Sequence, residues 1–321
     1  MNQSTITDSQ NSQELLNQII FEHFNEQKRK RKSRLFRRII YTVIFLILLG
    51  ILSFNHMEDT TIKFKPHVGL IDIKGEILDS QFSSSDSLMK SLANAYHNKG
   101  LQAVILRIDS PGGSPVQADY MYNALKYFMK KYPNIKTYAV CVDSCASAAY
   151  YVASAADEIY ANPTSMVGSI GVVYNGFGFV DLINKLGISR RLITSGQNKG
   201  FMDQFSPVNP NQEKDLQDML NLIHQQFINQ VKAGRGSRLK IDPNTFSGLI
   251  WTGEQAKQMG LIDGFASSGQ LVRDVIKIDS VVDYTEKTSV LDQFADKLGS
   301  SMLGQLPKSL NMKQGFQEIY G

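Results

Sequence analysis

The two residues of this chain best suited to chemistry are a serine and a lysine. Ser147 lies among small residues, in the segment Cys141-Val-Asp-Ser-Cys-Ala-Ser-Ala-Ala. Lys199 follows on a polar loop that carries a glycine, Ser195-Gly-Gln-Asn-Lys. A serine hydroxyl is a weak nucleophile until a neighbouring base takes its proton. The pair therefore predicts a serine hydrolase whose general base is a lysine.

Histidine, the usual base for such a serine, is missing from this part of the chain. The five histidines are at positions 23, 56, 67, 97 and 224, so none lies between residues 98 and 223. Lysine has an unperturbed pKa of about 10.4, so burial must lower that pKa before the amine can act as a base at neutral pH. Taken singly, each residue has a plainer explanation: Ser147 could cap a helix, and Lys199 could be a solvated loop lysine.

A turn rich in glycine, Ser110-Pro-Gly-Gly-Ser114, follows the strand that we predict just before the Ser147 segment. Proline and glycine permit a turn that leaves backbone N–H groups unpaired. Unpaired N–H groups are what an oxyanion hole requires. Such turns are also common in ordinary loops. This one is of interest because the Ser147 segment follows the next predicted strand in the same way.

The elements around these residues alternate between short apolar runs and helical patterns. Strands are predicted over 67–73, 103–109, 136–142 and 190–194, and helices over 83–97, 116–131, 147–156 and 211–231. This alternation predicts an α/β fold with mostly parallel strands, in which sites form at the carboxyl ends of the strands.

Two cysteines, Cys141 and Cys145, stand four residues apart in the same segment. In an extended strand they would be about 13 Å apart, beyond the reach of a disulfide, although a helix or tight turn could bring them closer. We expect packed free thiols. Zinc would need more ligands than this segment offers, and neither a metal nor a cofactor is predicted.

Composition indicates one globular domain with an N-terminal appendage. The 321 residues are 42% hydrophobic and 20% charged, enough to bury a full core. The net charge is +4, but residues 28–38 hold eight basic residues and no acid, so the rest of the chain is mildly acidic. Nucleic-acid binding needs basic residues gathered on the folded domain, so no nucleic-acid partner is predicted.

An uncharged apolar run, residues 39–54, follows directly after the basic arm. An apolar run beside so many cations is a poor core helix, so we predict a membrane anchor over residues 39–56. A buried core helix and a cleaved signal peptide are the alternatives, but the polar region before the run is long and no A-x-A site follows. The basic arm keeps the N-terminus in the cytoplasm, which predicts a single-pass protein of the cytoplasmic (inner) membrane with its body outside, in the periplasm or at the cell exterior.

Several segments, in their order along about residues 66–280, resemble the signal peptide peptidase A (protease IV) family. They are Asp109-Ser-Pro-Gly-Gly-Ser114, Ser147-Ala-Ala-Tyr-Tyr, Ala156-Asp-Glu-Ile-Tyr-Ala161, Val167-Gly-Ser-Ile-Gly-Val172, Ser195-Gly-x-x-Lys199 and Trp251-Thr-Gly-Glu-Gln-Ala-x-x-x-Gly-Leu-Ile-Asp263.

The resemblance implies a role for five residues. Ser147 is the nucleophile and Lys199 is the general base, which Ser169 orients. The amides of Gly113 and Ala148 form the oxyanion hole.

The resemblance leaves one choice open and shows two departures. Gly112 could supply the oxyanion amide in place of its neighbour, Gly113. Family members often carry glycine after the nucleophile, where this chain has Ala148-Ala149, and some carry a third glycine at the position of Ser114. Either change could narrow the pocket, but neither removes a catalytic side chain.

The resemblance also implies a fold, an assembly and a substrate. The fold is the spiral Clp-protease/crotonase-like α/β fold, and the partners are membrane lipid, other copies in a ring-like homo-oligomer, and peptide substrates, namely signal peptides left after secretion. The small residues beside Ser147 favour apolar peptides over acidic ones. The predicted parts are a polar cytoplasmic tail with its basic arm (1–38), the anchor (39–56), the catalytic domain (57–285) and a C-terminal extension (286–321).

Two other functions fit parts of this pattern. A Clp-type peptidase would need a Ser-His-Asp triad, and the missing histidine and the anchor argue against it. A crotonase-like thioester enzyme, or a non-catalytic scaffold, would be soluble and would not need Ser147 together with Lys199. A serine-directed covalent probe separates this last possibility from a peptidase.

Overall fold

The computed structural model of the protein describes residues 36–46, 65–79 and 83–286. These residues fall into two compact units, Met1–Ile62 and Lys63–Gly321, and each unit is described by itself. In the first unit, the described residues form one helix with exposed side chains.

The predicted membrane anchor lies only partly within the described residues. Its second part, residues 47–56, lies outside them, as do the tail before residue 36 and the extension after residue 286. Within the described ranges, no helix is long and apolar enough to cross a lipid bilayer.

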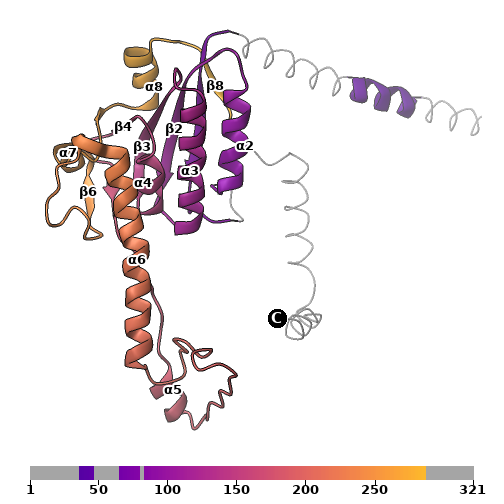
Figure 1. Ribbon diagram of the computed structural model, residues 1–321. Helices are drawn as coiled ribbons and strands as arrows, with labels where there is room; N and C mark the ends of the chain where they lie inside the picture. The colour runs from indigo at the N-terminus through magenta and orange to yellow at the C-terminus, as the bar shows by residue number, and fades with distance from the viewer. Residues whose placement is uncertain (1–35, 47–64, 80–82, 287–321) are drawn as a thin grey trace, which may run out of the picture. The chain divides into compact units, whose positions relative to one another are not determined.

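The second unit is built on a sheet whose main path runs β6-β5-β3-β2-β1-β8, with β4 beside β3 and β7 beside β4 (Figure 1). All strand pairs are parallel except β5 with β6, so the predicted α/β class is confirmed. The strands are β1 (His67–Lys74), β2 (Leu101–Ser110), β3 (Lys136–Ala146), β4 (Glu158–Ala161), β5 (Met166–Gly168), β6 (Ile250–Thr252), β7 (Gly264–Phe265) and β8 (Val281–Asp283).

The helices connect the strands and cover the sheet. Up to residue 156, every predicted strand and helix is present, and β3 extends four residues beyond its predicted end. The helices are α2 (Ser85–Tyr96), α3 (Pro115–Lys131), α4 (Ala148–Ala153), α5 (Val180–Lys185), α6 (Pro210–Arg235), α7 (Gly253–Gln258) and α8 (Ser268–Gln270), with the 3₁₀-helix η1 (Gly236–Arg238) and the π-helix η2 (Leu271–Ile276).

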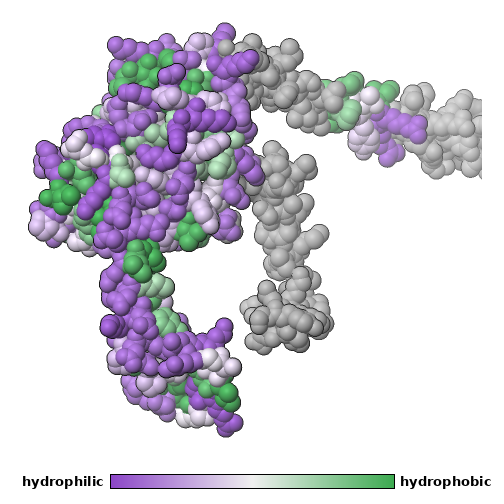
Figure 2. All heavy atoms as spheres, viewed as in Figure 1, coloured by the Kyte–Doolittle hydropathy of each residue, from purple (hydrophilic) through white to green (hydrophobic). Residues whose placement is uncertain are grey.

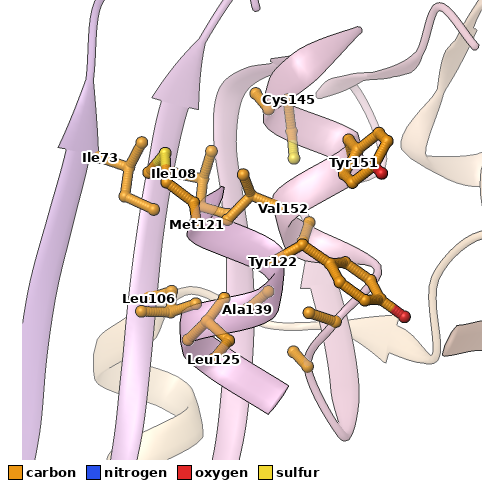
Figure 3. Close-up of a cluster of buried hydrophobic side chains, with 14 of the residues drawn as sticks. Ile73, Leu106, Ile108, Met121, Tyr122, Leu125, Ala139, Cys145, Tyr151 and Val152 are labelled. Carbon is orange, nitrogen blue, oxygen red and sulfur yellow. The ribbon is translucent and has the colours of Figure 1, made fainter. Parts of the chain in front are cut away.

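Two apolar clusters hold this unit together. In the larger one, Met121 and Leu125 of α3 pack against Leu106 of β2 and Ala139 of β3 (Figure 3). In the smaller one, Leu271 of η2 packs with residues of β1, β2 and β3. Because β2 contributes to both clusters, it is buried on both faces, as its apolar sequence predicts. Each fully buried leucine contributes about 1.5–3 kcal/mol to folding.

Strand β3 changes its neighbour just before it ends. Its residues 138–141 pair with β4, and its residues 144–146 pair with β5. On its other side, β2 advances two residues, from Ile108 to Ser110, while β3 advances four, from Cys141 to Cys145. This bulge bends the end of β3 and sets the direction in which the chain enters α4.

The bulge also decides how the two cysteines lie. Both thiols are free and fully buried, so the predicted packed free thiols are confirmed. The pKa of the Cys145 thiol is raised, mainly by burial and secondly by the hydrogen bond with Cys141. The two side chains meet because Val142 to Ser144 bulge out of the ladder, whereas a regular extended strand would hold them apart.

Residues 174–222, called the arm below, project from the sheet and include α5 and the first half of α6 (Figure 1). Apolar side chains are exposed along it: Phe177 is 69% exposed, Ile193 94% and Leu222 74%. Apolar surface is visible at its tip (Figure 2). The predicted strand over 190–194 is wrong, because this segment lies on the arm without a neighbouring strand to supply hydrogen bonds.

Candidate active site

Ser147 lies between β3 and α4 in a backbone conformation that residues other than glycine rarely adopt. Its φ is 53° and its ψ is −125°, a region that costs on the order of 1–3 kcal/mol for such a residue. Two hydrogen bonds hold it there: its N–H donates to the Gly168 carbonyl at 2.8 Å, and its carbonyl accepts from the Tyr151 N–H at 3.0 Å. The turn therefore fixes the direction of the Ser147 side chain.

The side chain of Ser147 does not cap helix α4, so capping does not explain this serine. Ser147 occupies the N-cap position of α4, but its hydroxyl makes no capping hydrogen bond. Ser147 instead lines a cavity of about 890 Å³. Strained backbone at a non-glycine residue that faces a cavity is typical of functional sites.

The glycine turn after β2 is anchored on both sides. The Gly112 N–H donates to Ser110 Oγ at 3.2 Å, and the Gly112 carbonyl accepts from the Ile77 N–H at 2.8 Å. The Ser114 N–H donates to the Ile77 carbonyl, also at 2.8 Å, and the Ser114 hydroxyl caps α3. Gly113 has no room for a side chain, because an added Cβ would lie 2.2 Å from the Ile77 carbonyl oxygen.

These bonds separate the two glycines that the sequence left as alternatives. The Gly112 amide is already paired, whereas the Gly113 amide has no hydrogen-bond partner in the described part of the chain. The Ala148 amide, at the first position of α4, likewise has none there. Gly113 and Ala148 both line the cavity beside Ser147. The geometry favours these two amides as oxyanion donors.

Ser169 lines the same cavity and directly follows Gly168, whose carbonyl accepts the Ser147 N–H. Its φ of 52° is also rare for a residue with a side chain. Its N–H donates to the Leu249 carbonyl at 2.8 Å, and its carbonyl accepts from the Gly171 N–H at 2.9 Å. The structure thus brings together Ser147, Ser169 and the two candidate amides.

Lys199 does not join this group within the described part of the chain. It lies on the arm, is exposed, and is absent from the residues that line the cavity. Its N–H donates to the Gly196 carbonyl at 3.2 Å, which closes a local turn. The chain therefore presents its candidate nucleophile and its candidate base on different parts of its surface.

Two further polar residues, Tyr151 and Asp119, line the cavity, and neither was predicted from the sequence. The Tyr151 hydroxyl donates to Asp119 Oδ1 at 2.7 Å. The pKa of Tyr151 is raised well above its ordinary value, mainly by burial and secondly by this hydrogen bond. The sequence did carry a signal for Tyr151, because a residue four positions after Ser147 lies on the same face of a helix.

His224 also lines the cavity, one residue beyond the histidine-free interval. Its Nε2 lies 3.0 Å from the Ile170 carbonyl oxygen. A Ser-His-Asp triad requires a histidine bonded to its carboxylate. Asp119 accepts hydrogen bonds from Tyr151, Gln226 and Asn123, and none joins it to His224. No group of three or more metal-binding side chains occurs among the described residues.

Comparison with known proteins agrees with a peptidase site. Residues 130–281 match Peptidase family S49. The chain is 40% identical over 182 residues to a Brucella abortus (strain 2308) protein named "Na(+)/H(+) antiporter NhaA", a match that covers 57% of this chain and 25% of that protein. The chain thus spans about a quarter of the length of this relative.

Two other relatives match over most of their length. "Putative protease slr0021" of Synechocystis sp. is 29% identical over 249 residues, covering 72% of this chain and 87% of that protein. "Putative signal peptide peptidase SppA" of Enterococcus faecium is 26% identical over 240 residues, covering 74% of this chain and 68% of that protein.

Proposed function

Because this chain belongs to the signal peptide peptidase A family, peptidase family S49, and has its Clp-protease/crotonase-like α/β fold, we propose that it is a membrane-anchored serine endopeptidase with a Ser147–Lys199 dyad. The observation that carries the proposal is the strained Ser147 turn, which faces a cavity beside the amides of Gly113 and Ala148.

The proposed reaction uses each of these groups in turn. Neutral Lys199 Nζ takes the proton of Ser147 Oγ as that oxygen attacks the scissile carbonyl. The amides of Gly113 and Ala148 donate to the oxyanion that forms. Lys199 then passes the proton to the leaving amine, and water hydrolyses the acyl-enzyme by the same route. In this proposal Ser169, which also lines the cavity, exchanges a hydrogen bond with the lysine and orients it.

Lys199 must then reach the cavity from another copy of the chain. The arm carries it away from Ser147 and exposes large apolar side chains such as Ile193 and Leu222. Contiguous exposed apolar surface marks interaction sites. In a closed ring, one surface of each copy meets a different surface of the next. We propose that the arm of one copy inserts Lys199 beside Ser147 of its neighbour.

Co-expression of two inactive variants tests this arrangement. Ser147→Ala and Lys199→Ala should each abolish peptidase activity in a folded protein. If each site takes its serine and its lysine from different copies, random mixing in equal amounts should restore about one quarter of the sites. Co-expression of Ser147→Ala with the double variant is the matched control, because it leaves no intact site. No recovered activity would mean that one chain supplies both residues, and near-normal turnover by Lys199→Ala alone would refute the dyad.

The proposed topology has a separate test. The eight basic residues at 28–38 and the apolar run after them support an anchor with the N-terminus in the cytoplasm. A reporter fused after residue 60 should be active only outside the cytoplasm, and a reporter at residue 1 only inside. A cytoplasmic signal from the downstream fusion would show the topology to be wrong.

The proposed substrates are remnant signal peptides and other apolar peptides. The walls beside the nucleophile include Ala148, Ala118 and Phe227, which suit aliphatic side chains. A substrate carboxylate would be costly to bury and would stabilise the charged form of Lys199. Leucine- and alanine-rich peptides should therefore have a higher kcat/KM than acidic peptides at a fixed pH. Equal values would remove the substrate proposal and leave the dyad untouched.

A further inference from the structure

Of the described residues that line the cavity beside Ser147, one carries a carboxylate: Asp119, whose hydrogen-bond partners in this part of the chain are neutral groups. Its Oδ1 accepts from the Tyr151 hydroxyl at 2.7 Å and from Gln226 Nε2 at 3.1 Å, and its Oδ2 accepts from Asn123 Nδ2 at 3.0 Å. Within the described residues, no lysine, arginine or histidine forms an ion pair with it. The negative charge of Asp119 is therefore solvated by dipoles but not neutralised.

Within one copy of the chain, the other walls of the cavity do not balance this charge, and the Lys199 proposed to enter from a neighbour acts there as a neutral amine. Among the described residues, no lysine or arginine lines the cavity, and the one histidine that does, His224, has its Nε2 at the Ile170 carbonyl. Most of the remaining lining is apolar or glycine, including Ile223 and Phe227. A carboxylate in such a setting attracts a cation and repels an anion more strongly than it would in open water.

The carboxylate is connected to the candidate nucleophile through a single side chain. Tyr151 lies one helical turn after Ser147, and its N–H donates to the Ser147 carbonyl at 3.0 Å. The hydroxyl of the same tyrosine holds Asp119. Asp119 and Ser147 thus line the same cavity and are joined through Tyr151.

We propose that Asp119 determines specificity by giving this cavity a preference for a substrate side chain that ends in a cation, a lysine or an arginine, within an otherwise apolar peptide. The inference rests on the proposed peptidase function and narrows its substrate class. The stem of a long basic side chain packs on the apolar walls while its charged end reaches the carboxylate. Signal peptides combine these two features, since a positively charged region adjoins an apolar core.

A positional scan with one charge-changing variant tests the inference. The substrates are N-acetylated peptides rich in leucine and alanine, in which one position at a time carries lysine, norleucine or glutamate. Acetylation leaves the side chain as the only cation, and a parallel set with free N-termini shows whether a terminal ammonium can take its place. The enzymes are the full-length wild type, Asp119→Asn, and the surface control Asp274→Asn, whose carboxylate pairs with its exposed neighbour Arg273.

At the position whose side chain enters the cavity, the wild type should cleave the lysine peptide with a kcat/KM about tenfold above that of the norleucine peptide. Asp119→Asn should bring the ratio close to one and should improve cleavage of the glutamate peptide. Asp274→Asn should leave both ratios unchanged. Fluorescence of the single tryptophan, Trp251, and the midpoint of thermal unfolding confirm that each variant is folded.

Three results would overturn the inference. One is an unchanged lysine-to-norleucine ratio in folded Asp119→Asn. Another is an equal change of kcat/KM for every peptide, which would mean that Asp119 acts on the base and not on the substrate. The third is a cationic preference confined to peptides with free N-termini, which would assign the site to a terminal ammonium. If Asp119→Asn does not fold, Tyr151→Phe takes its place, because it removes a neutral donor and should sharpen the preference for lysine. A wild type that cleaves none of the peptides, the all-aliphatic one included, would refute the peptidase proposal itself.

Discussion

Replacing Gly112 with alanine should disable the candidate nucleophile while the protein stays folded. An added Cβ would lie 2.7 Å from Ser147 Cβ and 2.9 Å from the Ala146 carbonyl oxygen. Non-bonded carbon atoms prefer a separation of about 3.5–4.0 Å, so the glycine turn and Ser147 must move apart by about 1 Å. The φ of Gly112, +111°, adds backbone strain of about 1–2 kcal/mol for a residue with a side chain.

The two effects differ in what they change. The strain lowers the free energy of unfolding, whereas the displacement misplaces Ser147 Oγ relative to the amides of Gly113 and Ala148. A misplacement of about 1 Å lowers the rate about 100-fold. Gly75→Ala is the matched control, because Gly75 also has a positive φ, +75°, but nothing lies within 4 Å of an added Cβ.

Two measurements separate strain from displacement. Denaturant unfolding followed by Trp251 fluorescence should show that both variants lose stability, by about 1–2 kcal/mol for Gly75→Ala and by somewhat more for Gly112→Ala. The rate of labelling of Ser147 by a fluorophosphonate, and kcat/KM on an aliphatic peptide, should fall about 100-fold in Gly112→Ala only. The reasoning fails if Gly112→Ala reacts within about threefold of Gly75→Ala, or if both variants lose reactivity equally.

The remaining predictions concern a histidine, a buried ion pair and the thiols. His224→Gln should keep kcat/KM within about threefold of the wild type, because the ring faces a backbone carbonyl; a loss of several orders of magnitude would support a Ser-His mechanism. Burial by itself raises the pKa of Asp263, but hydrogen bonds from Arg235 and the Ile159 N–H, together with the charges of Arg235 and Arg238, outweigh it and hold the pKa below its ordinary value. The stability from this carboxylate is therefore complete above its unfolded pKa of about 3.9 and is lost as the pH falls through the lower folded value. The free energy of unfolding should fall more steeply between about pH 5 and pH 2 in the wild type than in Asp263→Asn, and parallel curves would contradict the assignment. Cys141 and Cys145 should resist a thiol reagent such as dithionitrobenzoate in the folded protein and react together after unfolding; fast labelling of the native state would show that they are not buried.

Local patterns in the sequence were enough to predict the α/β class and the elements up to residue 156. Periodicity of apolar residues records which face of an element is buried, and this is a property of the segment itself. The strand β2, with apolar residues on both faces, and the glycine turn that holds Gly112 and Gly113 could be predicted from such local patterns. Ser147 could be singled out from its small neighbours, although its strained φ and its uncapped hydroxyl could not be foreseen.

Tertiary contacts decided the features that make these residues a site. The Gly112 amide is paired locally by Ser110 Oγ, but the turn that carries both glycines is held by two hydrogen bonds to Ile77, which approaches from a distant part of the chain. The bulge of β3 accompanies its change of partner from β4 to β5, and no residue within β3 signals that change. Asp119 enters the cavity only because α3 packs beside α4.

The arm shows most clearly where the sequence by itself falls short. Its segment at 190–194 contains Leu192, Ile193 and Thr194, which favour a strand, but a strand also needs a neighbour that completes its hydrogen bonds, and the described chain offers none. Lys199 is recognisable from its motif, yet its distance from Ser147 depends on the direction in which the arm projects from the sheet. The sequence therefore determined which residues could take part in catalysis. Whether those residues come together depends on packing between segments far apart along the chain or, as we propose for Lys199, between copies of the chain.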